Sequence, residues 1–335
     1  MQQYHDLVAD VLQRGGFKRN RTDVATISSF SHHYRVDLQQ GFPLLTTKDM
    51  DGYRWRSLIH ELLWYFSGEE HIRNLREETS IWDAWADEDG RLETAYGRFW
   101  RRYPVPDEGL DGEAWPDDGH RWTREDEHGR TFDQLQYVID TLRERPHSRR
   151  LVVNAWHPAN AAVSKLPPCH YTFTFNVQDG RLNTQLTQRS GDLALGVPFN
   201  IAAYALITHI VAQQADLEPG TFAHTIVDAH VYCGKGDRAD FYRSRLDELQ
   251  DRLRGVESRD DYRGFRDWLD DAAPPEPDGE EDHDHVPGLL EQLSREPLDR
   301  PSIRVADKDL DDLAFDDIEL ENYQAHDGIR FAVAE

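Results

Sequence analysis

Two adjacent prolines directly before a cysteine constrain this chain more than any other feature. They lie in the stretch Leu166–His170, and because proline fixes φ and donates no backbone hydrogen bond, they favour a rigid, extended approach to Cys169. The run Tyr171–Phe175 then alternates polar and apolar side chains, which predicts a strand. The cysteine is therefore expected at the start of a strand, in a fixed position.

The turn Asp179-Gly180 is a strong signal for a two-residue hairpin. Pairing across this turn places His170 opposite Arg189 and Cys169 opposite Ser190. In strict register the thiol and the guanidinium would point to opposite faces of the sheet. We therefore predict a β-bulge that brings both to one face.

The chemistry of Cys169 has two interpretations at this point. A nearby cation lowers the pKa of a thiol and raises the fraction of nucleophilic thiolate. Free cysteine, however, is more often a small buried residue without reactivity. The spacing alone leaves both open.

Ten motifs along the chain resemble the folate-dependent thymidylate synthases, in the order of that family. Three surround the cysteine: Leu166–His170, Gln188–Asp192 and Gly196–Ile201. The others are Asn20–Thr22, Phe42–Lys48, His60–Trp64, Ile81–Trp85, Tyr96–Gly97, Ser148–Arg150 and Asp228–Tyr232. The resemblance covers most of residues 1–233 and resumes near Leu293.

The resemblance implies one α/β (α+β) catalytic domain over residues 1–335. Its fold would be a mixed, bulged β-sheet backed by helices, and two subunits would pack sheet to sheet. Residues 104–132 resemble a lengthened, acidic surface loop. Residues 234–290 resemble an acidic, partly helical insertion relative to compact members of the family.

Within that insertion, apolar spacing predicts an amphipathic helix near residues 241–253 and a shorter one near 262–269. A linker is expected from Ala272 to Gly288. Its run Asp282–His285 could bind a metal, but we expect a solvated acidic loop.

The charge of the chain is strongly negative, with 63 acidic against 38 basic residues and a formal net charge of −25. This argues against DNA or an anionic membrane as a partner. Such an acidic chain, in which arginine supplies most of the positive charge, suggests a halophilic protein that works at high salt, where its self-repulsion is screened. Two cysteines, and no signal or membrane-length apolar segment, predict a cytoplasmic protein.

The activity implied by the resemblance is the reductive methylation of dUMP to dTMP. The one-carbon donor and reductant would be 5,10-methylenetetrahydrofolate, which leaves as dihydrofolate, so no metal is expected. Cys169 would add to C6 of the pyrimidine, and Asn200 would read the uracil edge and stabilise the developing charge. Glu61 and Tyr96 would handle the C5 proton through water, and Arg189 completes the expected catalytic set.

The resemblance also assigns binding residues. Those for dUMP are Arg21, Arg149, Arg150, Gln188, Arg189, Ser190, Asp192, Asn200, His230 and Tyr232. Those for folate are Lys48, Trp82, Trp85, Leu166, Asp192, Gly196, Phe199 and Ala334. Arg149 and Arg150 would reach the active site of the partner in a homodimer, and the C-terminal tail would close over the folate.

Two of these residues have plainer interpretations from sequence alone. Glu61 lies on the apolar helix Leu58–Phe66, where burial would raise the pKa of its carboxylate, but it could instead face water. His230 could suggest a metal site, yet a lone histidine is too little for zinc. The resemblance favours a catalytic Glu61 and a His230 that contacts deoxyribose.

Three other functions remain as alternatives. A deoxypyrimidine (dUMP or dCMP) hydroxymethylase would share this scaffold. A cysteine hydrolase using Cys169 and His170 is disfavoured, since neighbours on a strand point to opposite faces. A catalytically silent binding protein is conceivable because the chain departs from the family at Glu335, where an apolar residue is usual, and at the acidic Asp49–Asp51.

Overall fold

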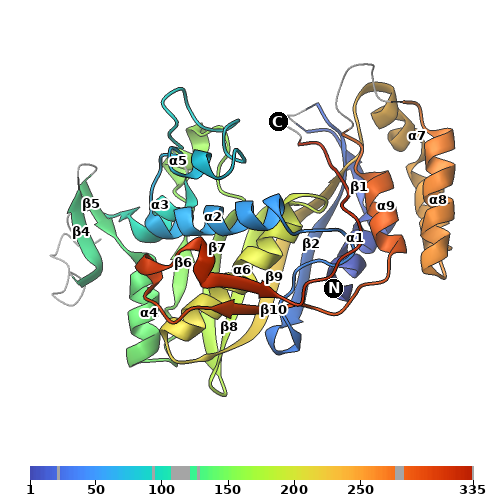
Figure 1. Ribbon diagram of the computed structural model, residues 1–335. Helices are drawn as coiled ribbons and strands as arrows, with labels where there is room; N and C mark the ends of the chain where they lie inside the picture. The colour runs from blue at the N-terminus through green and yellow to red at the C-terminus, as the bar shows by residue number, and fades with distance from the viewer. Residues whose placement is uncertain (21–22, 93–94, 107–120, 127–128, 276–282, 334–335) are drawn as a thin grey trace.

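The computed structural model describes residues 1–20, 23–92, 95–106, 121–126, 129–275 and 283–333. One large sheet crosses the body, with helices against one of its faces (Figure 1). Within the described part of the chain, no helix is long and apolar enough to cross a membrane. The C-terminal segments return across the body (Figure 1).

The central sheet has six strands in the order β1-β2-β9-β8-β7-β6. Their bounds are β1 Gly16–Lys18, β2 Thr26–Asp37, β6 Val152–Asn154, β7 His170–Gln178, β8 Arg181–Asp192 and β9 Glu218–Tyr232. The pair β8 and β9 is parallel, while the other neighbours are antiparallel. The sheet is therefore mixed, as the sequence predicts.

The β7–β8 hairpin confirms the predicted bulge and corrects the predicted register. Gln178 pairs with Arg181 across the turn, but the register shifts between His170 and Thr172. His170 therefore lies opposite Gln188 and not opposite Arg189. The extra residue in β7 is Tyr171, and it shifts the pairing of the residues before it by one position along β8.

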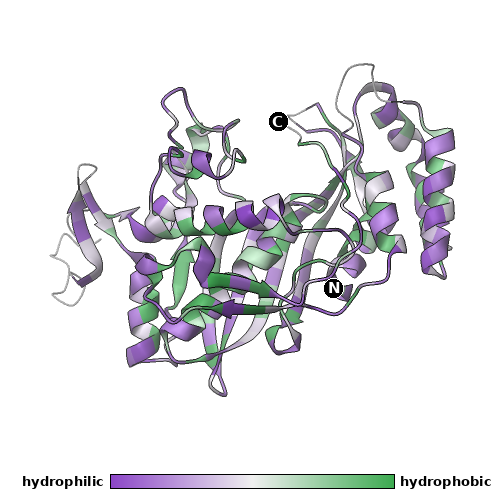
Figure 2. Cartoon of the chain, in the orientation of Figure 1, coloured by the Kyte–Doolittle hydropathy of each residue, from purple (hydrophilic) through white to green (hydrophobic). Residues whose placement is uncertain are grey.

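The described part of the first 214 residues includes six helices and two short 3₁₀ turns. They are α1 Gln2–Arg14, α2 Tyr53–Ser67, α3 Tyr96–Arg101, α4 Gln134–Glu144, α5 Pro158–Val163 and α6 Gly196–Gln214, with η1 Leu38–Gln40 and η2 Leu75–Glu77. Helix α6 buries side chains around its whole circumference, as a helix in a core must. Figure 2 shows this helix and the sheet as hydrophobic, whereas the outer helices are mostly hydrophilic.

A glycine sets the distance between α2 and α3. A Cβ atom on Gly97 would collide with the backbone of Tyr65, so only glycine permits this close approach. The contact brings Tyr96, the first residue of α3, beside the buried face of α2. The sequence motif Tyr96-Gly97 thus places a tyrosine next to Glu61 and Tyr65.

The segment expected to be a surface loop, residues 104–132, contains two strands in its described part. These are β4 Thr123–Asp126 and β5 Gly129–Phe132, and they form a three-stranded sheet with β3 Tyr103–Pro104. The hairpin β4–β5 projects from the body at the left of Figure 1. Trp122 anchors its base because the buried indole donates to Asp140 at 2.9 Å.

The expected helices of the insertion are present as α7 Gly236–Arg254 and α8 Arg259–Ala272, and α9 Val286–Ser294 follows. Helix α7 lies against α1, where Gln250 donates to the carbonyl of Gly15 at 2.7 Å. Arg252 lies 4.1 Å from the ring centre of Trp268 and joins α7 to α8. Figure 1 shows both helices at one edge of the molecule.

The interpretation of residues 282–285 as a solvated loop is wrong for its described part. His283, Asp284 and His285 are all buried, and Asp284 accepts hydrogen bonds from Arg238 and from Tyr242. The segment pairs back onto the end of β9, since the N–H of His285 donates to the carbonyl of Tyr232. The insertion therefore leaves and re-enters the body at adjacent points. Asp282 lies outside the described residues.

The C-terminal region forms a two-stranded sheet from β10 Ser302–Val305 and β11 Ile318–Glu321. Two 3₁₀ turns, η4 Leu310–Asp312 and η5 Phe315–Asp317, lie between these strands. Asp311 pairs with Arg101 at 2.5 Å, and Arg101 also pairs with the buried Asp133. These contacts fix the region to α3 and to the start of α4.

Candidate active site

A cavity of about 540 Å³ opens where α2, β8, β9, the start of α6 and the C-terminal tail meet. Most of the site residues expected from the sequence line it. They are Glu61, Trp82, Trp85, Leu166, Cys169, Gln188, Arg189, Ser190, Asp192, Gly196, Phe199, Asn200, His230 and Tyr232. Elements from both halves of the chain thus converge on one space.

Cys169 and Arg189 are backbone neighbours as a result of the bulge in β7. The N–H of Arg189 donates to the carbonyl of Cys169 at 2.8 Å. The guanidinium of Arg189 donates to the carbonyls of Pro167 and Pro168 at 2.6 and 3.0 Å. The proline pair therefore presents two acceptors that hold the arginine beside the thiol.

Glu61 is the carboxylate of the cavity that lies against aromatic side chains. Its Oε1 accepts hydrogen bonds from the Tyr65 hydroxyl at 2.8 Å and from the Trp82 indole at 2.7 Å. Burial raises the pKa of Glu61 to about 7, although these two hydrogen bonds act in the opposite direction. A carboxylate with this pKa can take up and release a proton near neutral pH.

Tyr96 lies directly behind the cysteine. Its hydroxyl accepts from the N–H of Cys169 at 2.8 Å, and its ring stacks on His170 with centroids 3.7 Å apart. The Nδ1 atom of His170 lies 2.8 Å from the Tyr204 hydroxyl, and burial lowers the pKa of His170 to about 3. His170 is thus a neutral core residue and no base for the thiol, which argues against the hydrolase alternative.

Asn200 lies one turn into α6, and its side-chain oxygen accepts from Gln188 Nε2 at 3.2 Å. His230 and Tyr232 lie on one face of β9 with ring centroids 5.2 Å apart, while Val231 between them is fully buried. Strand alternation thus places His230 and Tyr232 on the face opposite Val231.

Asp192 connects the cavity to the C-terminal tail. Its Oδ1 lies 3.8 Å from Nδ1 of His285 and accepts from the N–H of Ala194 at 2.8 Å. Although burial acts in the opposite direction, the charge of the nearby His285 lowers the pKa of Asp192, and the charge of Asp192 in turn raises the pKa of His285. The other ring nitrogen of His285 bonds the carbonyl of Ala332 at 2.9 Å.

Comparison with known proteins agrees with this geometry. A model of the family named thymidylate synthase matches residues 2–335. A thymidylate synthase of Haloferax volcanii is 71% identical over 330 residues, which cover 98% of this chain and 96% of that protein. The chain belongs to the thymidylate synthase family.

Membership in the thymidylate synthase family makes the chain a methyltransferase and supports the expected fold class. It gives no support to the hydroxymethylase alternative. The relative in Haloferax volcanii also agrees with the halophilic character expected from the acidic composition.

Four residues expected at the site lie outside the cavity lining. Arg149 and Arg150 are exposed beyond the end of α4, and Arg150 lines a separate surface hollow with Tyr137. Lys48 is buried beside the cavity, where it donates to the carbonyl of Ala194 at 2.5 Å. Burial lowers the pKa of Lys48 to about 7. Tyr96 lies one layer behind the lining, as described above.

Two expected site residues, Arg21 and Ala334, lie outside the described residues. Glu335, the departure at the end of the tail, also lies outside them. Their expected contacts therefore remain predictions.

The cavity includes residues that sequence reasoning did not select. They are Lys18, Asn20, Thr26, Tyr65, Ile81, Pro167, His170, Leu195, Asp228 and Val333. A signal existed for Tyr65, because it follows Glu61 by four residues and so shares its helix face. Lys18 forms an ion pair with Asp228, and only the pairing of β1, β2 and β9 brings these two together.

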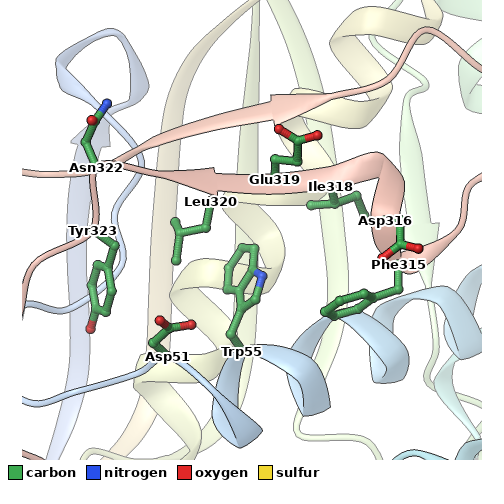
Figure 3. Close-up of a pocket in the computed structure, with 9 residues that line it drawn as sticks. All are labelled: Asp51, Trp55, Phe315, Asp316, Ile318, Glu319, Leu320, Asn322 and Tyr323. Carbon is green, nitrogen blue, oxygen red and sulfur yellow. The ribbon is translucent and has the colours of Figure 1, made fainter.

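A second cavity of about 630 Å³ lies between the start of α2 and strand β11 (Figure 3). Its labelled side chains include Asp51, which projects towards Leu320 and Trp55. One of the acidic departures from the family, Asp51, therefore faces this second cavity and not the lining of the first.

Proposed function

We propose that this chain converts dUMP to dTMP with 5,10-methylenetetrahydrofolate as co-substrate. The observation that carries the proposal is the convergence of Cys169, Arg189, Glu61 and Asn200 on one cavity. A thiol nucleophile, a cation, a proton-transferring carboxylate and a carboxamide are the groups that methylation at C5 of uracil requires. C5 is a poor nucleophile until a group adds at C6.

In this proposal the Cys169 thiolate forms a bond to C6, and the electron pair of the C5–C6 double bond moves to C5 and O4. Asn200 donates to O4, where negative charge develops. The phosphate of dUMP is held by Arg189 and Ser190 within this subunit, together with Arg21.

Glu61 is proposed to move the C5 proton through water. Its pKa of about 7 lets the carboxyl group donate in one step and accept in another without a large energetic penalty. Tyr96 assists because its hydroxyl lies against the backbone of Cys169.

Other residues that line the cavity fit a flat, polar heterocycle such as a pterin. Trp82, Trp85, Leu195 and Phe199 supply apolar walls, and Asp192 supplies a carboxylate that can accept from ring N–H groups. The bound folate would supply the methylene carbon and a hydride. The chain's own part is to orient it, and the tail near Val333 excludes water.

We also propose that the enzyme is a homodimer in the cytoplasm. The sheet face away from the helices exposes large apolar side chains, including Phe30 at 81% and Val152 at 42%. Exposed Arg149 and Arg150 would then enter the partner's cavity. Two free thiols, Cys169 and Cys233, agree with a reducing compartment.

The decisive experiment is tritium release from C5-labelled dUMP in molar KCl, with and without methylenetetrahydrofolate, in the wild type and in Cys169→Ala. The expected result is folate-dependent release matched by dihydrofolate, with a rate at least about 10³-fold lower in the variant. Release without dihydrofolate, or release that survives in Cys169→Ala, would contradict the proposal.

The dimer has its own test. Cys169→Ala and Arg150→Ala subunits are each expected to be impaired, and mixing them should restore up to about a quarter of wild-type activity, because one site of the mixed dimer has both groups intact. Mixtures that stay as inactive as their components would argue against a shared site.

A further inference from the structure

A chain of hydrogen bonds, buried at its centre and partly buried at both ends, runs from β2 through β9 and β8 to Asn200 on α6. The Tyr34 hydroxyl lies 2.7 Å from Nδ1 of His224. His224 Nε2 lies 3.0 Å from Oε1 of Gln188, and Gln188 Nε2 donates to Oδ1 of Asn200 at 3.2 Å. Tyr34 and His224 lie behind the residues that line the cavity.

The orientation of the Gln188 amide follows from its surroundings. Nε2 of Gln188 lies 2.8 Å from the backbone carbonyl of Ser190, and a carbonyl can only accept. The nitrogen must therefore face Ser190 and Asn200, and Oε1 must face His224. Gln188 is 2% exposed, so a rotated amide would have no water to compensate for two mismatched contacts.

The direction of the next bond is then fixed. Oε1 of Gln188 can only accept, so Nε2 of His224 carries the proton. Burial keeps His224 neutral, because it lowers the pKa of the imidazole to about 3. Nδ1 is consequently an acceptor, and the Tyr34 hydroxyl donates to it. The two rings also meet edge to face, with centroids 5.3 Å apart.

This chain fixes which atom of Asn200 can face which part of a nucleotide base. If the Asn200 amide rotated by 180°, its nitrogen would face the nitrogen of Gln188, and two donors would oppose each other. The present orientation leaves Oδ1 to accept from N3–H of uracil and Nδ2 to donate to O4. Cytosine has an acceptor at N3 and a donor at N4, so it requires the opposite orientation.

We propose that Tyr34 and His224 are positioning residues that make the site selective for uracil over cytosine nucleotides. They act through Gln188 by preventing rotation of the Asn200 amide. The inference rests on the proposed function, since it takes the base edge to be read by Asn200. Without the Tyr34 hydroxyl, His224 loses the bond that holds its tautomer, and the contact with the Ser190 carbonyl alone then opposes rotation of the Gln188 and Asn200 amides.

The test compares equilibrium affinity for dUMP and for dCMP, measured by calorimetry in molar KCl with the intact enzyme. Tyr34→Phe removes one hydroxyl and keeps the ring, while His224→Leu removes the imidazole. Each variant is expected to lower the ratio of dUMP to dCMP affinity on the order of tenfold. This is the effect on affinity of losing one well-oriented hydrogen bond to the base. The control is His209→Leu. It makes the same change at a largely buried histidine on a different element, α6, and should leave the ratio unchanged.

The outcomes separate this inference from the proposed function. Equal losses of both affinities, with a ratio within twofold of wild type, would mean a merely structural role and would overturn the inference. If His224→Leu does not fold, Tyr34→Phe decides alone. A wild-type enzyme that binds neither nucleotide would overturn the proposed function as well.

Discussion

His285 Nε2 bonds the backbone carbonyl of Ala332 at 2.9 Å and so joins the end of the insertion to the C-terminal tail. The same imidazole lies edge-on to Phe331, with ring centroids 5.1 Å apart. On its other side it faces the carboxylate of Asp192 in the cavity. The tail is thus held by the residue that precedes α9, near the end of the insertion.

His285→Ala should loosen the tail. We expect faster amide hydrogen exchange at residues 329–333 and a rise of about fivefold in KM for the folate, since one buried hydrogen bond contributes about 1 kcal/mol. His326→Ala is the matched control, because it removes a similar bond to the carbonyl of Glu296 at an exposed place. Unchanged exchange in the tail of His285→Ala would contradict this account.

Glu61→Gln should change the pH dependence of stability. The folded-state pKa of Glu61 is about 7, above its unfolded value of 4.5, so the folded protein binds the extra proton between these values. Wild-type stability therefore falls, through this group, as pH rises from 4.5 to 7, by at most about 3 kcal/mol. Glutamine does not titrate. The free energy of unfolding of the variant, relative to that of the wild type, should therefore be higher at pH 8 than at pH 5. An identical pH profile in both proteins would exclude the raised pKa.

The same substitution should slow methyl transfer by at least about 10²-fold while leaving dUMP affinity nearly intact. Initial rates and calorimetry measure the two effects separately. Loss of affinity without loss of turnover would assign Glu61 a binding role instead.

Local signals in the sequence predicted several elements correctly, for identifiable reasons. Asp179 and Gly180 have φ of 51° and 73°, as a hairpin turn of this type requires. The largely apolar segment from Phe199 to Ala215 is typical of a buried helix, and it lies mostly within α6. The proline pair and the cysteine predicted where β7 begins. A bulge was needed to bring Arg189 to the same face of the sheet as Cys169, and the structure contains a bulge there.

Other features depend on contacts between distant segments and could not be predicted in this way. Asp284 is 46 residues from Arg238, and only the fold brings them together, so an acidic run with two histidines looked like a solvated loop. Tyr34 and His224 are likewise register partners on β2 and β9, 190 residues apart. No local periodicity carries such information.

Arg238→Met should destabilise the protein by about 3 kcal/mol or more. It would leave the Asp284 carboxylate buried without its cation, and breaking a buried pair has costs of this size. Denaturant unfolding in molar KCl measures the loss. The matched control is Arg263→Met, which removes an arginine whose partner Asp260 is exposed, with an expected change below about 1 kcal/mol. Equal effects of both changes would mean that Asp284 is compensated by other groups.

The net charge of −25 should make stability depend on salt through screening. Carboxylates outnumber cations so strongly that repulsion outweighs the many exposed ion pairs, and salt weakens both. Since the Debye length falls from about 10 Å at 0.1 M to about 3 Å at 1 M, we expect Tm to rise between these concentrations, to a similar extent in NaCl and in KCl. Asp270→Asn combined with Asp271→Asn, on the exposed end of α8, should raise Tm at 0.1 M and have less effect at 1 M. A rise in KCl alone would indicate a specific ion site, and a Tm independent of salt would contradict the halophilic interpretation of the composition.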